Sequence, residues 1–367
     1  MGERDGSLEG LVNPDPAFWA GKRVLVTGHT GFKGGWLSVW LRELGAQVCG
    51  LSLPPVTEPS LFAALDLPGL VQSAFVDIRD AAALGSSIEA FRPEVVLHLA
   101  AQALVIEGYE NPTETFATNT MGLINLFEAV RRAPDARVIV NVTSDKCYEN
   151  NAWDYAYRET DALGGSDPYS ASKGCAELIS NAWRRSYFQK SGQWLATARA
   201  GNVIGGGDWS ADRLVPDCLR AFARGVSPSI RNPGAIRPWQ HVLEPLCGYL
   251  LLAERMWNEG EAFSQAWTFG PGDQDSIPVG EMATRLANLW GDGATWTSGA
   301  QNLYKEAMML RVDASRARAR LNWRSRLSLQ NALSWTVAWH RDFHDGRNPL
   351  DLTRSQIRAY CDLEAVA

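Results

Sequence analysis

The sequence lacks the patterns that indicate a metal site, a disulfide framework or a membrane span. Its six cysteines are scattered, no two stand in a C-x-x-C spacing, and only five histidines are present. Such usage is typical of buried thiols in a reducing compartment rather than of zinc ligands or disulfides. No apolar run approaches the length of a transmembrane helix, and the N-terminal residues are polar and acidic. We therefore expect a cytoplasmic protein with no metal and no disulfide.

Blocks of like charge are also missing. Charged residues make up 21% of the 367 residues, and their sum is a net charge of −6. This balance argues against nucleic acid or an anionic membrane as a partner. A small anionic molecule remains compatible, because a few local arginines are enough to bind it. With 46% hydrophobic residues, the chain can bury a sizeable core and divide into two lobes.

Short apolar runs alternate with longer amphipathic stretches through the first half of the chain. This alternation predicts an α/β fold with a Rossmann-type, doubly wound parallel sheet. The expected strands are 23–28, 46–53, 94–100, 136–144 and 194–205, and the expected helices between them include 33–44 and 115–133.

After about residue 205, proline, glycine and tryptophan punctuate shorter elements. We expect a smaller C-terminal lobe there, placed to hold substrate at the carboxyl edge of the sheet. The predicted division is an N-terminal extension at 1–20, a dinucleotide-binding domain at 21–200 and a substrate lobe at 201–367. A segment near 238–265 is expected to return to the first domain.

A glycine-rich turn, "VTGHTGFKGGWL", follows the first expected strand and opens a helix. Gly28, Gly31 and Gly34 have the spacing that lets a backbone approach a pyrophosphate at a helix N-terminus. The acid expected about 20 residues later, which would hold a ribose hydroxyl, is absent, and Ser52 stands nearby. The residues themselves therefore leave NAD and NADP open.

A second group of polar residues combines two segments. Tyr169 and Lys173 are four residues apart in "DPYSASKGCAEL", after an Asp-Pro pair typical of a helix start. An ammonium beside a phenol favours the phenolate, so we expect a lowered pKa for Tyr169. Ser144, Asp145 and Lys146 follow directly after a predicted buried strand.

Together these motifs resemble a known superfamily. The glycine turn, "HLAAQ", Asn119 in "FATNT", the strand-end serine and Y-x-x-x-K are similar to those of the extended short-chain dehydrogenase/reductases. "TSDKCYEN", "RAGNVIGGGDW" and "IRPWQHVLEP" resemble more particularly the branch of CDP-glucose 4,6-dehydratases. The likeness runs from about Phe18 to Trp335, nearly the whole chain.

The resemblance implies a nucleotide-sugar dehydratase that keeps NAD bound and converts CDP-glucose to CDP-4-keto-6-deoxyglucose. The sugar would be oxidised at C4, lose water across C5–C6 and regain the hydride at C6. Such enzymes serve deoxysugar biosynthesis, including that of O-antigen lipopolysaccharide. They form homodimers or homotetramers, and helices near 114–132 and 170–190 would pair across the interface.

The resemblance also assigns roles to individual residues of this chain. The implied catalytic residues are Ser144, Asp145, Lys146, Tyr169 and Lys173. The implied cofactor residues include the last two and also Gly28, Gly31, Phe32, Lys33, Gly34, Asp77, Ile78, Ala100 and Ala101. Asp77 and Ile78 would meet the adenine, although an ordinary strand end explains them equally well. The implied substrate residues are Asn119, Asn202, Arg213, Arg231 and Arg237.

Several alternatives stay open at this level. Lys146 stands where related thymidine-diphosphate enzymes have a glutamate base, so it is either a neutral base at C5 or a charged group that stabilises an enolate. We favour the second role because it needs no shifted pKa. Ile106 replaces an arginine of the family, and the 151–167 loop also departs from its pattern. These two departures leave the hexose and nucleotide open.

Other functions on the same scaffold are a nucleotide-sugar 4-epimerase, a dehydratase of another nucleotide hexose, or a non-catalytic dinucleotide-binding protein. An epimerase needs no acid at C6, so Asp145 together with Lys146 favours dehydration. The presence of Tyr169, Lys173 and the glycines argues against a protein that has lost catalysis.

Overall fold

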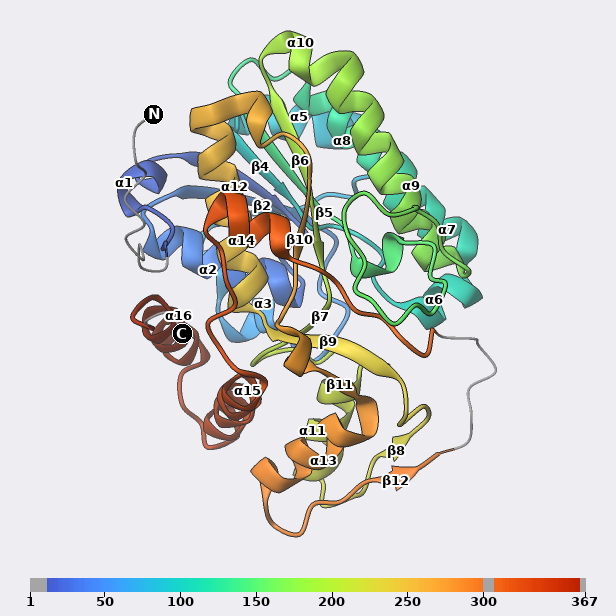
Figure 1. The fold of residues 1–367 in the computed structure, drawn as a ribbon. Helices are drawn as coiled ribbons and strands as arrows, with labels where there is room; N and C mark the ends of the chain where they lie inside the picture. The colour runs from blue at the N-terminus through green and yellow to red at the C-terminus, as the bar shows by residue number, and fades with distance from the viewer. Residues whose placement is uncertain (1–11, 300–306, 364–367) are drawn as a thin grey trace, which may run out of the picture.

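The computed structural model describes residues 12–299 and 307–363, and its centre is a seven-stranded parallel sheet (Figure 1). The strand order is β10-β6-β5-β4-β1-β2-β3. From β1, the chain first adds β2 and β3 on one side and then β4, β5, β6 and β10 on the other. This order confirms the predicted doubly wound sheet, whose ligands bind beyond the carboxyl ends of the strands. The strands are β1 (Arg23–Thr27), β2 (Gln47–Ser52), β3 (Gln72–Phe75), β4 (Val95–His98), β5 (Val138–Val142), β6 (Trp194–Ala200) and β10 (Ala266–Phe269).

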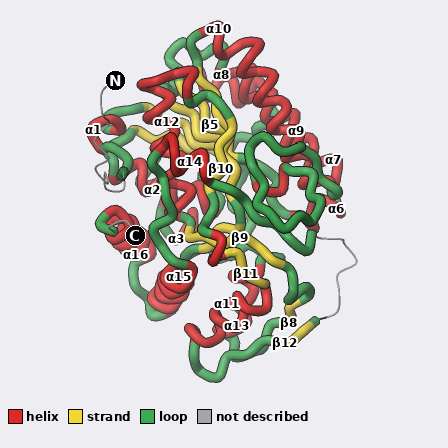
Figure 2. Tube along the Cα trace, viewed as in Figure 1, coloured by secondary structure: helices red, strands yellow, loops and turns green. Residues whose placement is uncertain are grey.

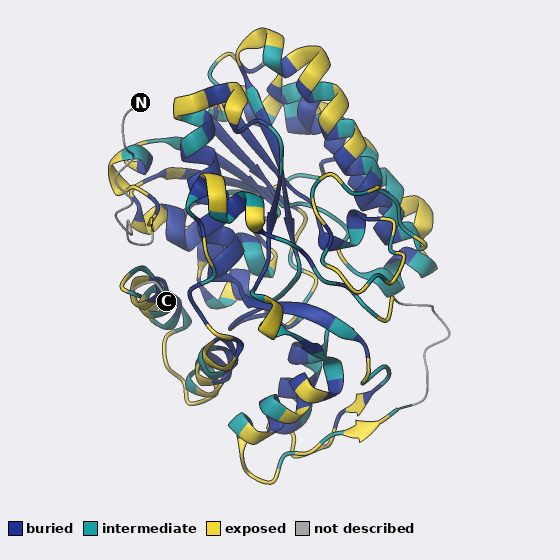
Figure 3. Cartoon of the chain, in the orientation of Figure 1, coloured by how far each residue is buried: buried dark blue, intermediate teal, exposed yellow. Residues whose placement is uncertain are grey.

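The central strands are apolar along their length because helices cover both faces of the sheet (Figures 2 and 3). Successive side chains of a strand point to opposite faces, so Val24 and Val26 join one core and Leu25 joins the other. The first core also holds side chains of α2 (Phe32–Glu43) and α12 (Leu243–Glu259). The second core is completed by α5 (Ala81–Phe91), α8 (Leu123–Val130) and α9 (Pro168–Trp183).

The smaller lobe lies below the carboxyl edge of the large sheet in Figure 1. It contains a three-stranded sheet in the order β11-β9-β7 and a two-stranded pair of β8 and β12. Its strands are β7 (Asn202–Ile204), β8 (Ser229–Ile230), β9 (Ile236–His241), β11 (Ser276–Pro278) and β12 (Thr297–Ser298). Its helices are α11 (Leu214–Ala223), α13 (Val279–Trp290) and α15 (Leu329–His344).

One expected strand is divided between the two sheets. The sequence predicted a single strand over 194–205, and this was wrong, because β6 ends at Ala200 in the large sheet and β7 starts at Asn202 in the small one. Gly201 lies at the crossing, where a Cβ would come within 2.6 Å of the Pro238 ring. The chain therefore passes from one lobe to the other at a glycine that Pro238 of β9 approaches too closely for a side chain.

Segments from the second half of the chain pack on the first lobe. Helix α12 covers the sheet, β10 extends it beside β6, and α16 (Pro349–Cys361) packs on α2. Near the N-terminus, the indole nitrogen of Trp19 donates a 2.6 Å hydrogen bond to the Glu254 carboxylate of α12. The two lobes are thus interleaved in sequence. The segment that returns to the first lobe includes α12 and extends through β10.

The remaining short helices are α1 (Pro16–Trp19), α3 (Leu61–Ala64), α4 (Leu67–Leu70), α6 (Val105–Glu110), α7 (Pro112–Phe116), α10 (Gln189–Ser191) and α14 (Ser315–Leu321). Within the described chain, no helix combines the length and the apolar character needed to cross a bilayer. The six cysteines, all at described positions, carry free thiols. The described residues contain no cluster of His, Cys, Asp and Glu arranged to hold a metal ion.

Candidate active site

The glycine turn joins the end of β1 to the start of α2, with Gly31 in the cap position. Gly28 has φ +78°, and a Cβ there would come within 2.7 Å of the Ala100 backbone nitrogen. A Cβ on Gly34 would collide with the Gly28 carbonyl, whereas one on Gly31 would meet that oxygen at an ordinary 3.4 Å. Gly28 and Gly34 are therefore required by the fold itself, and Gly31 leaves open space before the helix N-terminus. This cradle fits a pyrophosphate bound by backbone N–H groups.

The other residues predicted for the cofactor lie at neighbouring strand ends. Ala100 follows β4, and its backbone nitrogen donates to the Thr27 hydroxyl at 3.2 Å. Asp77 follows β3 and is paired with Arg79 at 2.6 Å, and this hydrogen-bonded ion pair lowers the pKa of the carboxyl. Ile78 is buried beside Gly122, and its side chain occupies the space that a Cβ on Gly122 would need.

The predicted catalytic residues come together from two elements. Ser144 caps a 3₁₀ turn, Asp145–Cys147, that follows β5 directly, and α9 packs against this turn. The Ser144 hydroxyl donates to Asp145 Oδ1 at 3.1 Å and accepts from the Lys146 backbone N–H at 3.2 Å, and it lies near enough to the Tyr169 phenol to act on its pKa. One hydroxyl therefore neighbours both the phenol and the carboxyl.

Helix α9 begins where the Asp-Pro pair predicted. Asp167 accepts from the Ser170 backbone N–H at 2.9 Å and from its hydroxyl at 2.6 Å. Tyr169 and Lys173 follow on one face, with the Lys173 ammonium 6.0 Å from the centre of the phenol ring. Both side chains are buried.

Burial controls the pKa values of this pair. Loss of solvent raises the pKa of Tyr169 to about 12, although the neighbouring Ser144 hydroxyl opposes the change. Burial also lowers the pKa of Lys173 to about 8. The expected lowering of the Tyr169 pKa was wrong for the protein alone. The loss of hydration destabilises a phenolate by more than the neighbouring groups stabilise it.

Asp145 is a buried acid in the lining of a pocket. Burial raises the pKa of its carboxyl, while Lys146, the Ser144 hydrogen bond and Arg237 act in the opposite direction. Its Oδ2 atom is buried and has no hydrogen-bond partner among the described residues. A carboxyl with a raised pKa and a free oxygen can carry a proton and donate it to an incoming ligand.

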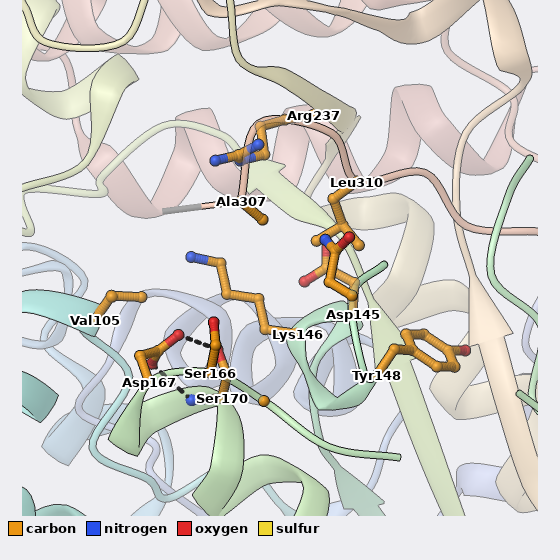
Figure 4. Close-up of a pocket in the computed structure, with 12 residues that line it drawn as sticks. Val105, Asp145, Lys146, Tyr148, Ser166, Asp167, Ser170, Arg237, Ala307 and Leu310 are labelled. Carbon is orange, nitrogen blue, oxygen red and sulfur yellow. Dashed lines mark hydrogen bonds between the residues drawn. The ribbon is translucent and has the colours of Figure 1, made fainter. Parts of the chain in front are cut away.

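Figure 4 shows the pocket next to these residues, with Lys146 and Arg237 directed into the same space. Arg237 is buried, and its guanidinium also donates to the Ile236 carbonyl at 2.9 Å. The pocket joins both lobes and the loop before α9. It is lined by Val105, Asp145, Lys146, Tyr148, Asn150, Gly165, Ser166, Asp167, Ser170, Arg237, Ala307 and Leu310.

The remaining predicted substrate residues lie around this pocket rather than in its lining. Arg213 caps α11 and lies 3.5 Å from the Asp208 carboxylate, and its charge acts on Tyr169. Arg231 is more exposed and pairs with Asp212 at 3.4 Å. Asn202 stands at the start of β7.

Asn119 makes its hydrogen bonds within the protein. Its amide oxygen accepts from the Gln102 N–H, and its amide nitrogen donates to the Gln102 carbonyl and the Ser172 hydroxyl, each at 2.9 Å. It therefore fixes the loop after β4 to α9. Lys33 of the glycine turn lies close enough to Asp145 and Lys173 for their charges to act on it, and burial lowers its pKa to about 7.

Sequence reasoning did not select several pocket residues. Leu310 comes from a segment distant in the chain, and no local motif marks it. Asn150 was visible in the quoted motif, and its amide donates to the Met309 carbonyl at 2.9 Å, which ties the two segments together. Ile106 and Glu107 lie on α6, where Glu107 accepts from Asn111 at 2.8 Å.

Comparison with known proteins places these observations in context. Residues 24–264 match the NAD dependent epimerase/dehydratase family. The chain is 49% identical over 351 residues to the CDP-glucose 4,6-dehydratase of Salmonella typhimurium, covering 94% of this chain and 98% of that protein. It is 26% identical to the UDP-glucose 4-epimerase of Mycoplasma pneumoniae, over 88% of this chain and 98% of the relative.

Solved structures show the same fold at lower identity. The UDP-glucose 4-epimerase of Thermotoga maritima, solved with UDP-glucose, has a TM-score of 0.77 and 21% identity, covering 88% of this chain and 99% of its own. The dTDP-glucose 4,6-dehydratase of Streptomyces venezuelae, solved with NAD bound, has a TM-score of 0.75 and 23% identity, covering 89% and 99%.

Proposed function

The chain belongs to the NAD-dependent epimerase/dehydratase family, and we propose that it is a CDP-glucose 4,6-dehydratase that forms CDP-4-keto-6-deoxyglucose. The observation that carries this proposal is the buried cluster of Tyr169, Ser144 and Asp145, in which an acid with a raised pKa accepts from the serine that neighbours the phenol. The 49% identity to the Salmonella enzyme over nearly its full length supports the choice of nucleotide and sugar.

The glycine cradle and the neighbouring strand ends fit NAD. Gly28, Gly31, Phe32, Lys33 and Gly34 would hold its pyrophosphate at the start of α2. Asp77 and Ile78 would meet its adenine, Ala100 and Ala101 would border the dinucleotide, and Tyr169 and Lys173 would hold the nicotinamide ribose. When bound, NAD supplies a hydride acceptor at C4 of the sugar and gives the hydride back at C6.

The residues of the chain supply the proton transfers. Tyr169 removes the proton of the C4 hydroxyl, and Ser144, which lies beside the phenol and donates to Asp145, shares it. The C4 ketone then acidifies the neighbouring C5–H bond, and a basic group other than the charged Lys146 takes the C5 proton and returns it to C5 after the hydride reaches C6. Asp145, whose pKa is raised by burial, donates a proton to the C6 hydroxyl, which leaves as water. Lys146, as an ammonium, stabilises the enolate that forms at C4 and C5.

Arginines account for binding of the nucleotide diphosphate. Arg237 points into the pocket and would bind the pyrophosphate of the substrate, since a guanidinium can bind phosphate oxygens with two parallel hydrogen bonds. Arg213, Arg231 and Asn202 would follow the path of the nucleotide. Asn119 contributes to the site by fixing Gln102 and Ser172.

We also propose that the enzyme is a homodimer or homotetramer in the cytoplasm and serves deoxysugar biosynthesis, such as that of O-antigen lipopolysaccharide. Large apolar side chains lie exposed on and next to α8 and α9, namely Met121, Leu178 and Tyr187. Pairing of these helices between subunits would cover them. Nucleic acid and membranes are not expected partners.

The test incubates the pure protein with NAD and, separately, CDP-, dTDP-, UDP- and GDP-glucose. Dehydration is read from the alkaline ultraviolet absorbance of a 4-keto-6-deoxy sugar and from a mass loss of one water. Turnover of CDP-glucose alone supports the proposal. A C4 epimer without loss of water would identify an epimerase, and turnover of another nucleotide sugar would reassign the substrate.

A further inference from the structure

Glu177 is a buried carboxylate on the catalytic helix that has no place in the chemistry described above. It follows Tyr169 and Lys173 on α9 at intervals of four residues, so the three side chains lie along one face of the helix. Its side chain is only 3% exposed. A buried acid of this kind needs partners that compensate for its lost hydration.

The partners of Glu177 come from β6 and from the residue that follows β5. Oε1 accepts from the Thr143 hydroxyl at 2.5 Å, and Oε2 accepts from the Thr197 hydroxyl and from Arg199 Nη2, both at 2.8 Å. Arg199 is equally buried, which makes this a desolvated ion pair. Thr143 directly precedes Ser144, so the carboxylate connects α9 to the strand end that carries the other catalytic residues.

Arg199 continues the connection towards the pocket. Its Nη1 donates to the Glu159 carbonyl at 3.3 Å, and its guanidinium lies 4.9 Å from the centre of the Tyr148 ring. Tyr148 lines the pocket and stacks on Tyr157 with ring centres 5.1 Å apart. The ion pair therefore contacts the catalytic helix, the catalytic turn and the loop that borders the substrate.

We propose that Glu177 is a positioning residue of the active site, which sets the distance between the Tyr169–Lys173 pair and the Ser144–Asp145 turn. This inference rests on the proposed function for its catalytic consequence. The reason is geometric, because catalytic groups misplaced by about 1 Å can lose roughly 100-fold in rate.

Glu177 also provides a negative charge facing Lys173. The groups whose charges or rings act on this lysine are Glu177, Cys147, His98, Lys33 and Tyr169. Burial keeps the thiol, the imidazole and the phenol uncharged, and Lys33 acts as a like charge. Burial raises the pKa of Glu177, but Arg199 and the hydroxyl hydrogen bonds more than offset it and hold the carboxyl ionised.

A purely structural role would produce a different result. Removing one member of a buried ion pair destabilises a protein whatever its place in the fold. Glu244 of α12 provides a control for loss of a buried, hydrogen-bonded carboxyl outside the site, since it accepts from the Arg326 backbone N–H at 2.9 Å and from the Leu327 N–H and Tyr360 hydroxyl at 2.7 Å. The test therefore compares Glu177→Gln and Thr143→Val with Glu244→Gln, all with measured melting temperatures.

The first measurement is steady-state dehydration of CDP-glucose. We expect Glu177→Gln to lower kcat about 100-fold, with KM changed less than threefold, because the groups that bind the nucleotide are untouched. Thr143→Val should lower kcat about tenfold, and it decides the question if Glu177→Gln does not fold. Glu244→Gln should keep kcat within threefold. Retention of kcat by a folded Glu177→Gln, or an equal loss in Glu244→Gln, would overturn the proposal.

The second measurement is calorimetric titration with NAD from pH 7 to pH 9, which does not depend on turnover. Loss of the Glu177 charge should make NAD binding weaken about one pH unit earlier than in the wild type, because Lys173 becomes neutral sooner. An unchanged pH dependence would overturn the proposal. If the wild type dehydrates no nucleotide sugar, the proposed function fails, and this titration still decides the role of Glu177.

Discussion

The Ser144 hydroxyl donates a 3.1 Å hydrogen bond to Asp145 Oδ1 and also acts on the pKa of the Tyr169 phenol. This contact explains the position of an acid just after the buried strand β5. Burial raises the pKa of Asp145 and so favours its protonated form, next to the group that removes a proton from the sugar. The group that removes a proton from the sugar and the acid that donates one to the departing hydroxyl therefore lie next to each other.

Asp145→Asn should separate oxidation from dehydration. The amide keeps the size of the side chain but cannot donate a catalytic proton, so we expect dehydration to fall about 10²- to 10⁴-fold. Oxidation at C4 should continue, and NADH absorbance should rise after CDP-glucose is added. Asp275→Asn is the control, because burial also raises the pKa of that carboxyl. Asp275 lies in the smaller lobe, where it accepts from the Leu329 N–H. Normal dehydration by Asp145→Asn would remove Asp145 from the mechanism.

Two substitutions of Lys146 distinguish its possible roles. If its charge stabilises the enolate, Lys146→Arg should keep activity within about tenfold, whereas Lys146→Met should lose about 10²- to 10³-fold. If a neutral lysine is the base at C5, both variants should be equally inactive, since arginine does not lose its proton. The measurement is kcat, together with exchange of the C5 hydrogen in deuterated water.

The pH profile follows from the lowered pKa of Lys173, about 8. Activity should decline as the pH rises through 8, because the neutral amine no longer helps the buried phenol to ionise. Stability should change in the opposite sense. Between pH 8 and the ordinary lysine value of 10.5, the unfolded chain holds a proton that the folded protein has released, so the free energy of unfolding rises with pH.

The contribution of this lysine is isolated by comparing wild type with Lys173→Met in urea titrations at each pH. Other groups contribute equally to both proteins, so their difference reports Lys173. A difference that stays constant from pH 7 to pH 10 would contradict the assignment.

Gly28 and Gly85 form a matched pair of glycines. Gly28→Ala places a Cβ within 2.7 Å of the Ala100 nitrogen at a residue with φ +78°, so it should destabilise the protein and abolish NAD binding. Gly85 lies within α5 with no atom within 4 Å of an added Cβ. Gly85→Ala should therefore stabilise the protein by about 1 kcal/mol. Thermal unfolding and NAD titration test both, and retention of NAD binding by Gly28→Ala would contradict the role of the glycine turn.

Local signals in the sequence predicted the sheet and the catalytic elements. The glycine turn, the strand-end "TSDK" and the Asp-Pro start of α9 each depend on neighbouring residues, and all three form as expected. Gly201 shows the limit of such signals, because an apolar run does not reveal that its two halves pair with different strands.

The finer features of the site depend on contacts between distant segments. The spacing of Tyr169 and Lys173 gave their proximity but not their burial, and burial decides the sign of the phenol pKa shift. Likewise, nothing near Glu177 in the sequence indicates that it binds Thr143 and Arg199. These features require the folded arrangement of β5, β6 and α9.

The most direct test of the central claim follows a deuterium atom. The protein is incubated with CDP-glucose that carries deuterium at C4, and the product is analysed by mass spectrometry and NMR. The account predicts loss of one water and deuterium at C6 of a 4-keto-6-deoxy sugar, because the hydride removed at C4 is returned to C6. Deuterium retained at C4 of an epimerised hexose, or a product without deuterium at C6, would contradict it.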